Sequence, residues 1–512
     1  MPPYSSIAFA FLLIWLIKKF VVFRANRKLE SPYPPGPKPK PLIGNLLDFP
    51  MTGVAQTYVE WGKEYNSDIL YATALGNRVV ILNNREDAEE LFEKRANKYS
   101  DRPEIPLIKL MGWGYNMTLY GYGDKWRMHR KICQQNFRPE AVLKYRPLLT
   151  KMVHKMLQSL VDTPADFEHH NKMLSISLPM MLMYGYEVKT FEDPCVVAAD
   201  RSITLGAHLL LPGSSLINVF PVLAYIPKWF PGATSQKIAA EVKKLTDEME
   251  RIPMEFARKR VKEGTAIPSL VSDFLERKYS VGASIEEEEM IKNVASTVYG
   301  GASDTTISST GTFLYAMAAN PDVQKKGQAE IDLVIGSNRL PVFEDRQSLP
   351  YVEAIYREVM RFRPPAQLGI PHSLSEDDYY KGFFIPKGTT IFANIWAMTH
   401  DETVYTEPLK FKPERFLGDD GKLNNDDKIL AYGFGRRVCA GKYVASSTMW
   451  LMMACVLATF DIVKSKDELG NDIEIDHSYE DFGLLNHKAK YQCSFVPRSQ
   501  LARQLIADTR QP

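Results

Sequence analysis

The chain has 512 residues, 45% of them apolar, so it can bury a large core, and its length alone would allow two to four domains. Its 63 basic and 61 acidic residues give a formal charge of +2, which is too balanced to indicate nucleic acid as a partner. The five cysteines are an odd number without Cys-x-x-Cys pairs. That usage argues against a disulfide framework or structural zinc site and favours a reducing compartment.

The N-terminus predicts a membrane anchor. An apolar run from Ile7 to Ile17 continues from Phe20 to Phe23 beyond two lysines, and as a helix this span would reach roughly 25 Å. A cleaved secretory signal, the alternative, carries its positive charge before the apolar run, whereas here the basic residues follow it. We therefore expect residues 1–28 to be a retained single-pass anchor, with the rest of the chain facing the cytosol.

The next segment, residues 29–40, is dense in proline, so it cannot be helical and is predicted to be an extended, semi-rigid hinge. Beyond it no second linker or repeat interrupts the chain, which predicts one large domain over residues 41–512. Most of this domain has helical patterning. A smaller β portion is predicted near Asp68 to Leu82 and near Phe383 to Phe392.

One long helix is predicted to begin after Ser284, whose side chain can cap the first turn while that of Glu287 reaches back in a capping box. No proline follows until Pro321, so the helix can extend for about 50 Å. Its middle reads Gly-Gly-Ala-Ser-Asp-Thr-Thr from Gly300 to Thr306, where each glycine costs roughly 1 kcal/mol of helix stability. Either close packing against a neighbouring helix or a functional groove must offset that cost.

Two further patterns follow in chain order. Glu358 and Arg361 have the i,i+3 spacing that places both charges on one face of a helix, which Pro364 and Pro365 should end. About fifty residues later comes Phe-Lys-Pro-Glu-Arg-Phe from Phe411 to Phe416. Taken alone, a Glu/Arg pair of this kind is usually a solvated helix face.

The segment from Tyr432 to Gly441 combines turn glycines, arginines and Cys439, and an apolar helical run from Tyr443 to Phe460 follows it. A cysteine at a helix start has a lowered pKa, which favours the thiolate that ligates metals. An adjacent arginine can pair with an anionic group of a cofactor. A lone Cys-x-Gly would more often be an ordinary buried thiol, and the complete pattern favours the functional interpretation.

In this order, the motifs resemble those of the cytochrome P450 superfamily, and fungal microsomal members in particular, over nearly the whole chain. The resemblance implies a single, mainly α-helical domain with a smaller β portion. It also implies that Cys439 is the axial thiolate ligand of the iron of haem b, with Gly435 as a turn glycine of the ligand loop and Arg437 as a partner of a haem propionate. Tyr432 stands where the family usually has phenylalanine, and we expect it to pack in the same place.

The resemblance assigns roles to more distant residues too. Trp126, Arg130 and His372 match positions that approach the haem propionates. Asp304 and Thr305 match the acid and alcohol that deliver protons to bound oxygen, which makes Thr305 the first candidate for catalysis. Ala302 stands where the family often has glycine, and we expect it to narrow the oxygen groove by one methyl group.

A charge network completes the set of implied site residues. By resemblance, Glu358, Arg361 and Arg415 are buried together and hold the cysteine loop in place. Breaking the network would leave a buried charge unpaired, so its expected role is structural.

The function implied is that of a monooxygenase that inserts one oxygen atom of O2 into an apolar organic substrate. NADPH–cytochrome P450 reductase at the endoplasmic reticulum membrane would supply the electrons. A terpenoid or aromatic substrate of secondary metabolism, or a xenobiotic, fits the apolar segments that the family uses to line its pocket. Two alternatives stay open: a haem-thiolate isomerase or dehydratase that needs no reductase, and a non-catalytic haem protein that senses a ligand. The presence of Asp304 and Thr305 favours the monooxygenase.

Overall fold

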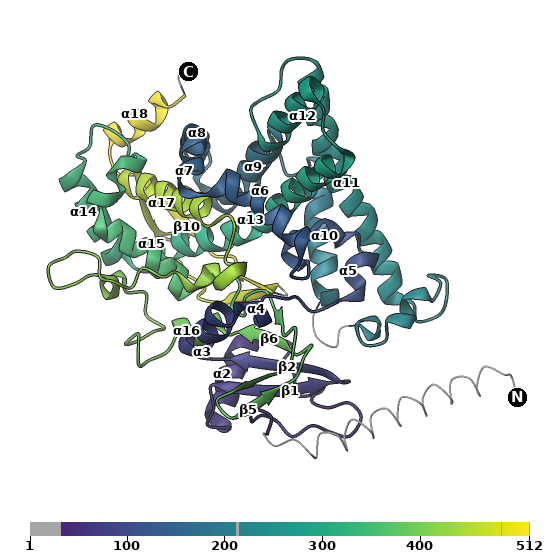
Figure 1. The fold of residues 1–512 in the computed structure, drawn as a ribbon. Helices are drawn as coiled ribbons and strands as arrows, with labels where there is room; N and C mark the ends of the chain where they lie inside the picture. Colours follow the sequence, from purple (N-terminus) through teal and green to yellow (C-terminus); the bar gives the residue numbers. More distant parts are fainter. Residues whose placement is uncertain (1–31, 211–214, 483, 511–512) are drawn as a thin grey trace, which may run out of the picture.

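A computed structural model describes residues 32–210, 215–482 and 484–510 (Figure 1). This part of the chain is mainly α-helical with a smaller β content, as predicted. The predicted anchor, residues 1–28, lies outside the described residues. Within the described ranges, no helix is both long enough and apolar enough to cross a membrane.

Helices are the main elements of the described chain, and Figure 1 shows the longer ones gathered above the main sheet. In chain order they are α2 (Val54–Glu64), α3 (Arg85–Glu89), α4 (Ala96–Tyr99), α5 (Pro106–Leu110), α6 (Asp124–Phe137), α7 (Pro139–Val142), α8 (Arg146–Asp162), α9 (Phe167–Tyr184), α10 (Pro194–Leu210), α11 (Thr234–Lys262), α12 (Leu270–Val281), α13 (Ile285–Ala319), α14 (Pro321–Val334), α15 (Pro350–Phe362), α16 (Ile395–Thr399), α17 (Lys442–Thr459) and α18 (Gln500–Asp508).

The main sheet has four strands in the order β1-β2-β6-β3, with β2 and β6 parallel and the other two pairs antiparallel. Three two-stranded antiparallel sheets accompany it, formed by β4 with β5, β7 with β10 and β8 with β9. The strands are β1 (Ile69–Ala74), β2 (Asn77–Leu82), β3 (His372–Ser373), β4 (Asp378–Tyr380), β5 (Phe383–Ile385), β6 (Thr390–Ala393), β7 (Phe460–Lys464), β8 (Tyr479–Phe482), β9 (Leu485–Lys488) and β10 (Cys493–Pro497). Both predicted β regions are therefore confirmed.

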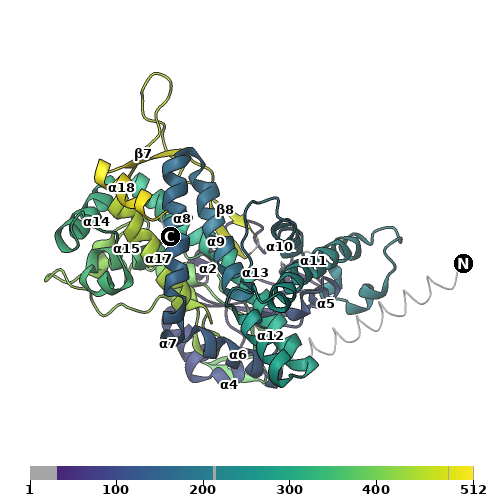
Figure 2. The same ribbon diagram turned by 90° about the horizontal axis from the view of Figure 1, so that it is seen from above.

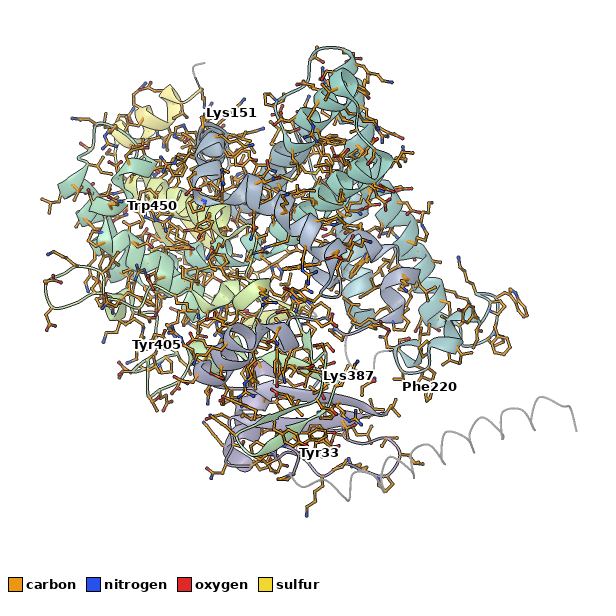
Figure 3. All side chains as sticks on the ribbon, viewed as in Figure 1. Tyr33, Lys151, Phe220, Lys387, Tyr405 and Trp450 are labelled. Atoms are coloured by element: carbon orange, nitrogen blue, oxygen red, sulfur yellow. The ribbon has the colours of Figure 1, made fainter. Side chains whose placement is uncertain are left out.

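The proline-rich segment is extended where it is described, over residues 32–40, but it is not a free linker. Its carbonyl groups accept hydrogen bonds from two sheets, Tyr71 N–H of β1 to Pro35 O at 2.9 Å and Phe384 N–H of β5 to Pro32 O at 2.9 Å. The ring of Tyr33 stacks on that of Tyr71 with 4.7 Å between the centroids. The described part of the predicted hinge thus docks on the main sheet, where Figure 3 labels Tyr33.

The long helix α13 is the axis around which the other helices pack. It begins as predicted: the hydroxyl of Ser284 accepts a hydrogen bond from Glu287 N–H at 3.1 Å, and the Glu287 carboxylate accepts one from Ser284 N–H at 2.9 Å. The helix has 35 residues and ends before Asn320. It contacts α6, α9, α15, α17 and β9, and Figure 2 shows it passing between the helices on either side.

Helix α17 is a core helix. Its residues from Met449 to Leu457 are all buried, which agrees with the nearly continuous apolar sequence predicted to follow Cys439. Trp450, labelled in Figure 3, is among the largest fully buried side chains of the described residues. The cysteine loop is therefore attached to an element that cannot move without disturbing the core.

A buried charge network joins α15 to the segment before the cysteine loop, as the sequence predicts. The Glu358 carboxylate is fully buried and accepts two hydrogen bonds from Arg361, from Nε at 2.7 Å and Nη2 at 2.8 Å, and one from Arg415 Nε at 3.2 Å. The two arginines use their remaining N–H groups on backbone carbonyls, including those of Thr399 and Thr406. One carboxylate therefore balances two buried cations and fastens three segments together.

We predict that Glu358→Ala lowers the free energy of unfolding by about 3–5 kcal/mol, because it leaves two buried guanidinium groups without a counter-charge. The measurement is denaturant-induced unfolding followed by intrinsic fluorescence. The matched control is Glu344→Ala, which removes an exposed ion pair with Arg146 and should cost less than about 1 kcal/mol. Equal losses in the two variants would contradict the role assigned to Glu358.

Candidate functional site

The cysteine loop is held in shape by its backbone. Gly435 has a φ of +54°, and a Cβ there would lie 2.0 Å from the carbonyl oxygen of Phe92, so no side chain fits. The backbone N–H of Cys439 donates to the carbonyl of Tyr432 at 2.8 Å. The hydroxyl of Tyr432 lies 2.9 Å from that of Tyr356 on α15. The tyrosine therefore packs where phenylalanine was expected and adds a buried polar link to α15.

Cys439 is not the first residue of a helix, because α17 begins at Lys442 and its N-cap is Gly441. The helix start nevertheless acts on the sulfur. Burial raises the pKa of the Cys439 thiol, and this is opposed by a hydrogen bond from the backbone N–H of Gly441 and by the charges of Arg130 and Lys442. Cys439 is exposed as a residue, although protein atoms surround its thiol.

Three arginines lie together, with Arg102 buried and Arg130 and Arg437 half-buried. The carboxylate of Asp101 acts on Arg102 and Arg437 without forming an ion pair with either. None of Arg102, Arg130 and Arg437 forms an ion pair among the described residues. Burial lowers the pKa of all three, and Arg437 lowers that of Arg102 further through its charge. Arg437, with a pKa lowered to about 10, also has a buried Nη1 atom without any hydrogen-bond partner. Uncompensated buried cations are costly, so this cluster fits an anionic group.

Trp126 and His372, two of the predicted propionate partners, flank this arginine cluster. The guanidinium of Arg437 lies over the indole of Trp126, 4.4 Å from the ring centroid, and the indole N–H has no acceptor in the described part of the chain. His372 donates from Nδ1 to the carbonyl of Tyr99 at 2.7 Å. Burial and two nearby arginines hold the pKa of His372 well below its usual value, so it is neutral here. The other ring nitrogen of His372 would donate a hydrogen bond to a carboxylate only after the imidazole gains a second proton. A bound anion favours that protonation.

Arg102 is a site residue that the sequence analysis did not identify. It is buried and donates to the carbonyls of Thr118, Ile370 and Pro371, at distances of 2.7 to 2.9 Å. It therefore joins the segment after α5 to the loop before β3 while contributing positive charge next to Arg437. No spacing pattern in the sequence marks it, because its partners are backbone carbonyls far away along the chain.

The middle of α13 is open where the paired glycines lie. Gly301 is exposed, and a Cβ placed on it would meet no atom within 4 Å. Close packing against a neighbouring helix therefore does not explain this glycine, which instead borders free space. One turn later, the hydroxyl of Thr305 donates to the carbonyl of Gly301 at 3.0 Å. Ala302 and Thr305 are both partly exposed, so the helix presents small and polar groups at this point.

The carboxyl group of Asp304 is harder to ionise than that of an ordinary aspartate. Burial raises its pKa to about 6, with a further contribution from Asp200, whereas the charge of Lys172 acts in the opposite direction. A carboxyl group with this pKa can both take up and release a proton near neutral pH. No direct contact joins Asp304 or Thr305 to Cys439 in the ranges that the structure describes.

Comparisons with known proteins give one consistent result. The family model described as "Cytochrome P450" matches residues 34–495. The chain is 38% identical over 491 residues to cytochrome P450 monooxygenase COX2 of Coprinopsis cinerea, a match that covers 95% of this chain and 93% of that protein. It is 37% identical over 486 residues to cytochrome P450 monooxygenase ple1 of Rhodocybe pseudopiperita, covering 94% and 92%. It is 38% identical over 504 residues to cytochrome P450 monooxygenase 208 of Postia placenta, covering 97% and 96%.

The raised pKa of Asp304 predicts a pH-dependent contribution to stability. Because the folded state binds the proton more tightly than the unfolded state, this contribution is present at low pH and is lost as the pH rises through about 6. Relative to Asp304→Asn, the free energy of unfolding of the wild type should fall by about 1 kcal/mol between pH 5 and pH 8. Denaturant titrations at several pH values measure the difference.

The control for this prediction is Asp419→Asn, in an exposed turn, which should follow the wild type at each pH. A constant difference between wild type and Asp304→Asn over the whole range would contradict the raised pKa.

Proposed function

The chain belongs to the cytochrome P450 family, and on that premise we propose that Cys439 is the axial thiolate ligand of haem b. The observation that carries the proposal is the place of Cys439 beside a group of arginines that form no ion pair among the described residues. Family membership implies a haem iron, which, when bound, supplies the reductive activation of O2. Coordination to iron would keep the thiol deprotonated despite the burial that raises its pKa.

Arg102, Arg130 and Arg437 would hold the two haem propionates, which provide the negative charge that this cluster lacks. The unpaired Nη1 of Arg437 and the unpaired indole N–H of Trp126 are donors suited to carboxylate oxygens. Gly435 lets the ligand loop pass against Phe92, and the network around Glu358 fixes the segment that precedes the loop. These residues orient the cofactor and take no part in proton transfer.

Asp304 and Thr305 would supply the protons for the reaction. Asp304 can carry a proton because its pKa lies near 6, and the hydroxyl of Thr305 can pass one on when its hydrogen bond to Gly301 O is released. The free space at Gly301 leaves room for a diatomic molecule beside that hydroxyl. The narrowing expected from Ala302 amounts to one methyl group on a partly exposed surface.

The enzyme is a cytochrome P450 monooxygenase. For this chain we propose the balanced reaction in which a C–H bond of the substrate, O2, two electrons and two protons give an alcohol and water. The electrons would come from NADPH through NADPH–cytochrome P450 reductase. The substrate we propose is an apolar terpenoid or aromatic compound of fungal secondary metabolism, or a xenobiotic, in keeping with the monooxygenase names of the fungal relatives.

A basic surface near the cysteine loop fits the reductase. Arg127 and Lys131 on α6 are exposed, as is Arg436 in the loop itself, and Lys442 follows at the start of α17. Arg127 is partly neutralised by Asp124, and Arg436 donates to the hydroxyl of Tyr122 at 2.7 Å. An acidic surface on the reductase would pair with these basic side chains and speed the association of the two proteins.

We also propose that the protein is held at the endoplasmic reticulum membrane by residues 1–28, with its catalytic domain in the cytosol. Residues 215–233, before α11, support membrane contact: they project from the body in Figures 1 and 2 and include Phe220, labelled in Figure 3. Several of their apolar side chains are exposed, with Tyr225 at 87% and Trp229 at 79%. Exposed aromatic groups of this kind favour the membrane interface.

We predict that Thr305→Ala lowers product formation by about a hundredfold, because the hydroxyl that passes on the proton is lost. Consumption of NADPH should continue, with the two electrons released as hydrogen peroxide. The measurement uses the purified protein with reductase, NADPH and heavy-isotope O2 on a panel of terpenoid and aromatic compounds, following product by mass spectrometry. Wild-type product should contain one labelled oxygen atom.

Thr306→Ala is the matched control, because it removes a hydroxyl from the next residue of the same helix and should keep at least half of the activity. Substrate conversion without reductase or O2 would instead support an isomerase or dehydratase. Full activity of Thr305→Ala would contradict the role given to Thr305.

A further inference from the structure

The side chain of Tyr115 presents a free hydroxyl group beside the open part of α13. A Cβ placed on Gly300 would lie 3.7 Å from this hydroxyl oxygen, so the phenol lies against the glycine next to Gly301. We propose that Tyr115 is a specificity residue that donates a hydrogen bond to an acceptor oxygen of the substrate. The inference rests on the proposed function and narrows the substrate to an apolar molecule that carries a hydroxyl, ether or carbonyl oxygen.

The backbone of Tyr115 is fixed from the side of α13. The hydroxyl of Thr297 accepts a hydrogen bond from Met117 N–H at 3.1 Å and donates to the carbonyl of Tyr115 at 3.3 Å. The hydroxyl of Tyr120 donates to the same carbonyl at 2.9 Å. Two hydrogen bonds therefore hold one peptide group, so the position from which the phenol projects is set before any ligand binds.

The segment that carries Tyr115 is also fixed from the opposite side. Trp113 Nε1 donates to the hydroxyl of Ser202 on α10 at 3.2 Å, and that hydroxyl lies 3.0 Å from the hydroxyl of Thr246 on α11. Thr246 in turn donates to the carbonyl of Met111 at 3.2 Å. A Cβ on Gly206 would lie 2.4 Å from the indole of Trp113, so the helix receives the ring only because it has glycine there. The segment cannot swing Tyr115 away without breaking this buried chain.

The hydroxyl itself has no hydrogen-bond partner among the described residues, although the rest of the segment is well bonded. Tyr115 is half-buried, and its hydroxyl lies beside Gly300, next to the exposed Gly301. Burial of the ring, and to a lesser degree Glu250, raises the pKa of the phenol, which keeps it protonated and able to donate. A preorganised donor in apolar surroundings gains most from an acceptor on the ligand.

The surroundings of the Tyr115 hydroxyl favour an uncharged hydrogen-bond acceptor on the ligand. The neighbouring side chains that pack in the same cluster are apolar, including Leu119 and Leu205. Glu250 already acts on the phenol as a negative charge, so a ligand carboxylate beside the same hydroxyl would meet a like charge. A terpenoid or aromatic compound with one neutral oxygen therefore fits better than a hydrocarbon or an acid.

The experiment uses probes that are anchored at the haem, so it does not require knowledge of the natural substrate. N-alkylimidazoles of increasing length are compared with ω-methoxyalkyl imidazoles of equal length, and each Kd is read from the shift of the Soret band. The ether oxygen accepts a hydrogen bond but cannot donate one. At one chain length, Tyr115→Phe should raise the ratio of ether to alkyl Kd by about three- to tenfold over that of the wild type.

Tyr184→Phe is the matched control, because its hydroxyl lies 3.1 Å from that of Ser296 in the core, and it should leave the ratio unchanged. The Kd of the plain alkyl probes should stay within about twofold in Tyr115→Phe, which shows that the pocket is intact. A ratio that is the same in wild type and Tyr115→Phe at every length would overturn the proposal. Absence of any Soret shift with all probes would instead show that the proposed haem site has failed.

A second measurement uses only the wild type. The crystal structure with the tightest-binding ether probe should place the ether oxygen within hydrogen-bond distance of the Tyr115 hydroxyl. An ether oxygen bound to a different donor would overturn the assignment even if the Tyr115→Phe protein could not be prepared.

Discussion

Buried positive charge is the constraint on which the rest of this structure depends. Two sets of arginines are removed from water, and they are treated differently. Arg361 and Arg415 share the carboxylate of Glu358 and are complete within the protein. Arg102 and Arg437 donate only to backbone carbonyls and leave their charge unbalanced. Because an unpaired buried charge is costly, the first set stabilises the fold, whereas the second set fits the anionic cofactor that we propose.

The central helix α13 connects the two halves of the proposed chemistry. Its capped start and its contacts with α6, α15 and α17 make it rigid, so the gap at Gly301 is a fixed feature of the fold. Glycine lowers the stability of the helix at this point. Thr305 and the weakly acidic carboxyl group of Asp304 lie within one turn of Gly301. Tyr115, on a separate segment, lies beside the same part of α13. The proposed substrate contact and the proposed proton donors therefore both depend on this helix.

The sequence was sufficient where the signal is local. The capping box of Ser284 and the pairing of Glu358 with Arg361 follow from spacings of three residues, and the structure reproduces both. The predicted strand regions and the buried helix after the cysteine also agree. The resemblance named further residues, such as Arg437 and Trp126, and the structure places these two in contact.

The remaining features depend on contacts between distant segments. Arg102 could not be recognised because backbone carbonyls, which every residue has, are its partners. The lowered pKa of His372 depends on burial and on two arginines elsewhere in the chain, and the hydroxyl of Tyr115 lies beside a glycine of α13 that is distant in sequence. The docking of Tyr33 on Tyr71 likewise turned a predicted linker into part of the sheet surface. None of these contacts has a periodicity or a fixed spacing in the sequence.

The most direct test of the account is the carbon monoxide difference spectrum of the dithionite-reduced protein, recorded for the wild type, Cys439→Ala and Cys133→Ala. Thiolate ligation by Cys439 predicts the Soret band characteristic of the family in the wild type and in Cys133→Ala, whose thiol is buried in the core. The band should be absent from Cys439→Ala. A spectrum typical of histidine-ligated haem in the wild type, or an unchanged band in Cys439→Ala, would contradict the central claim.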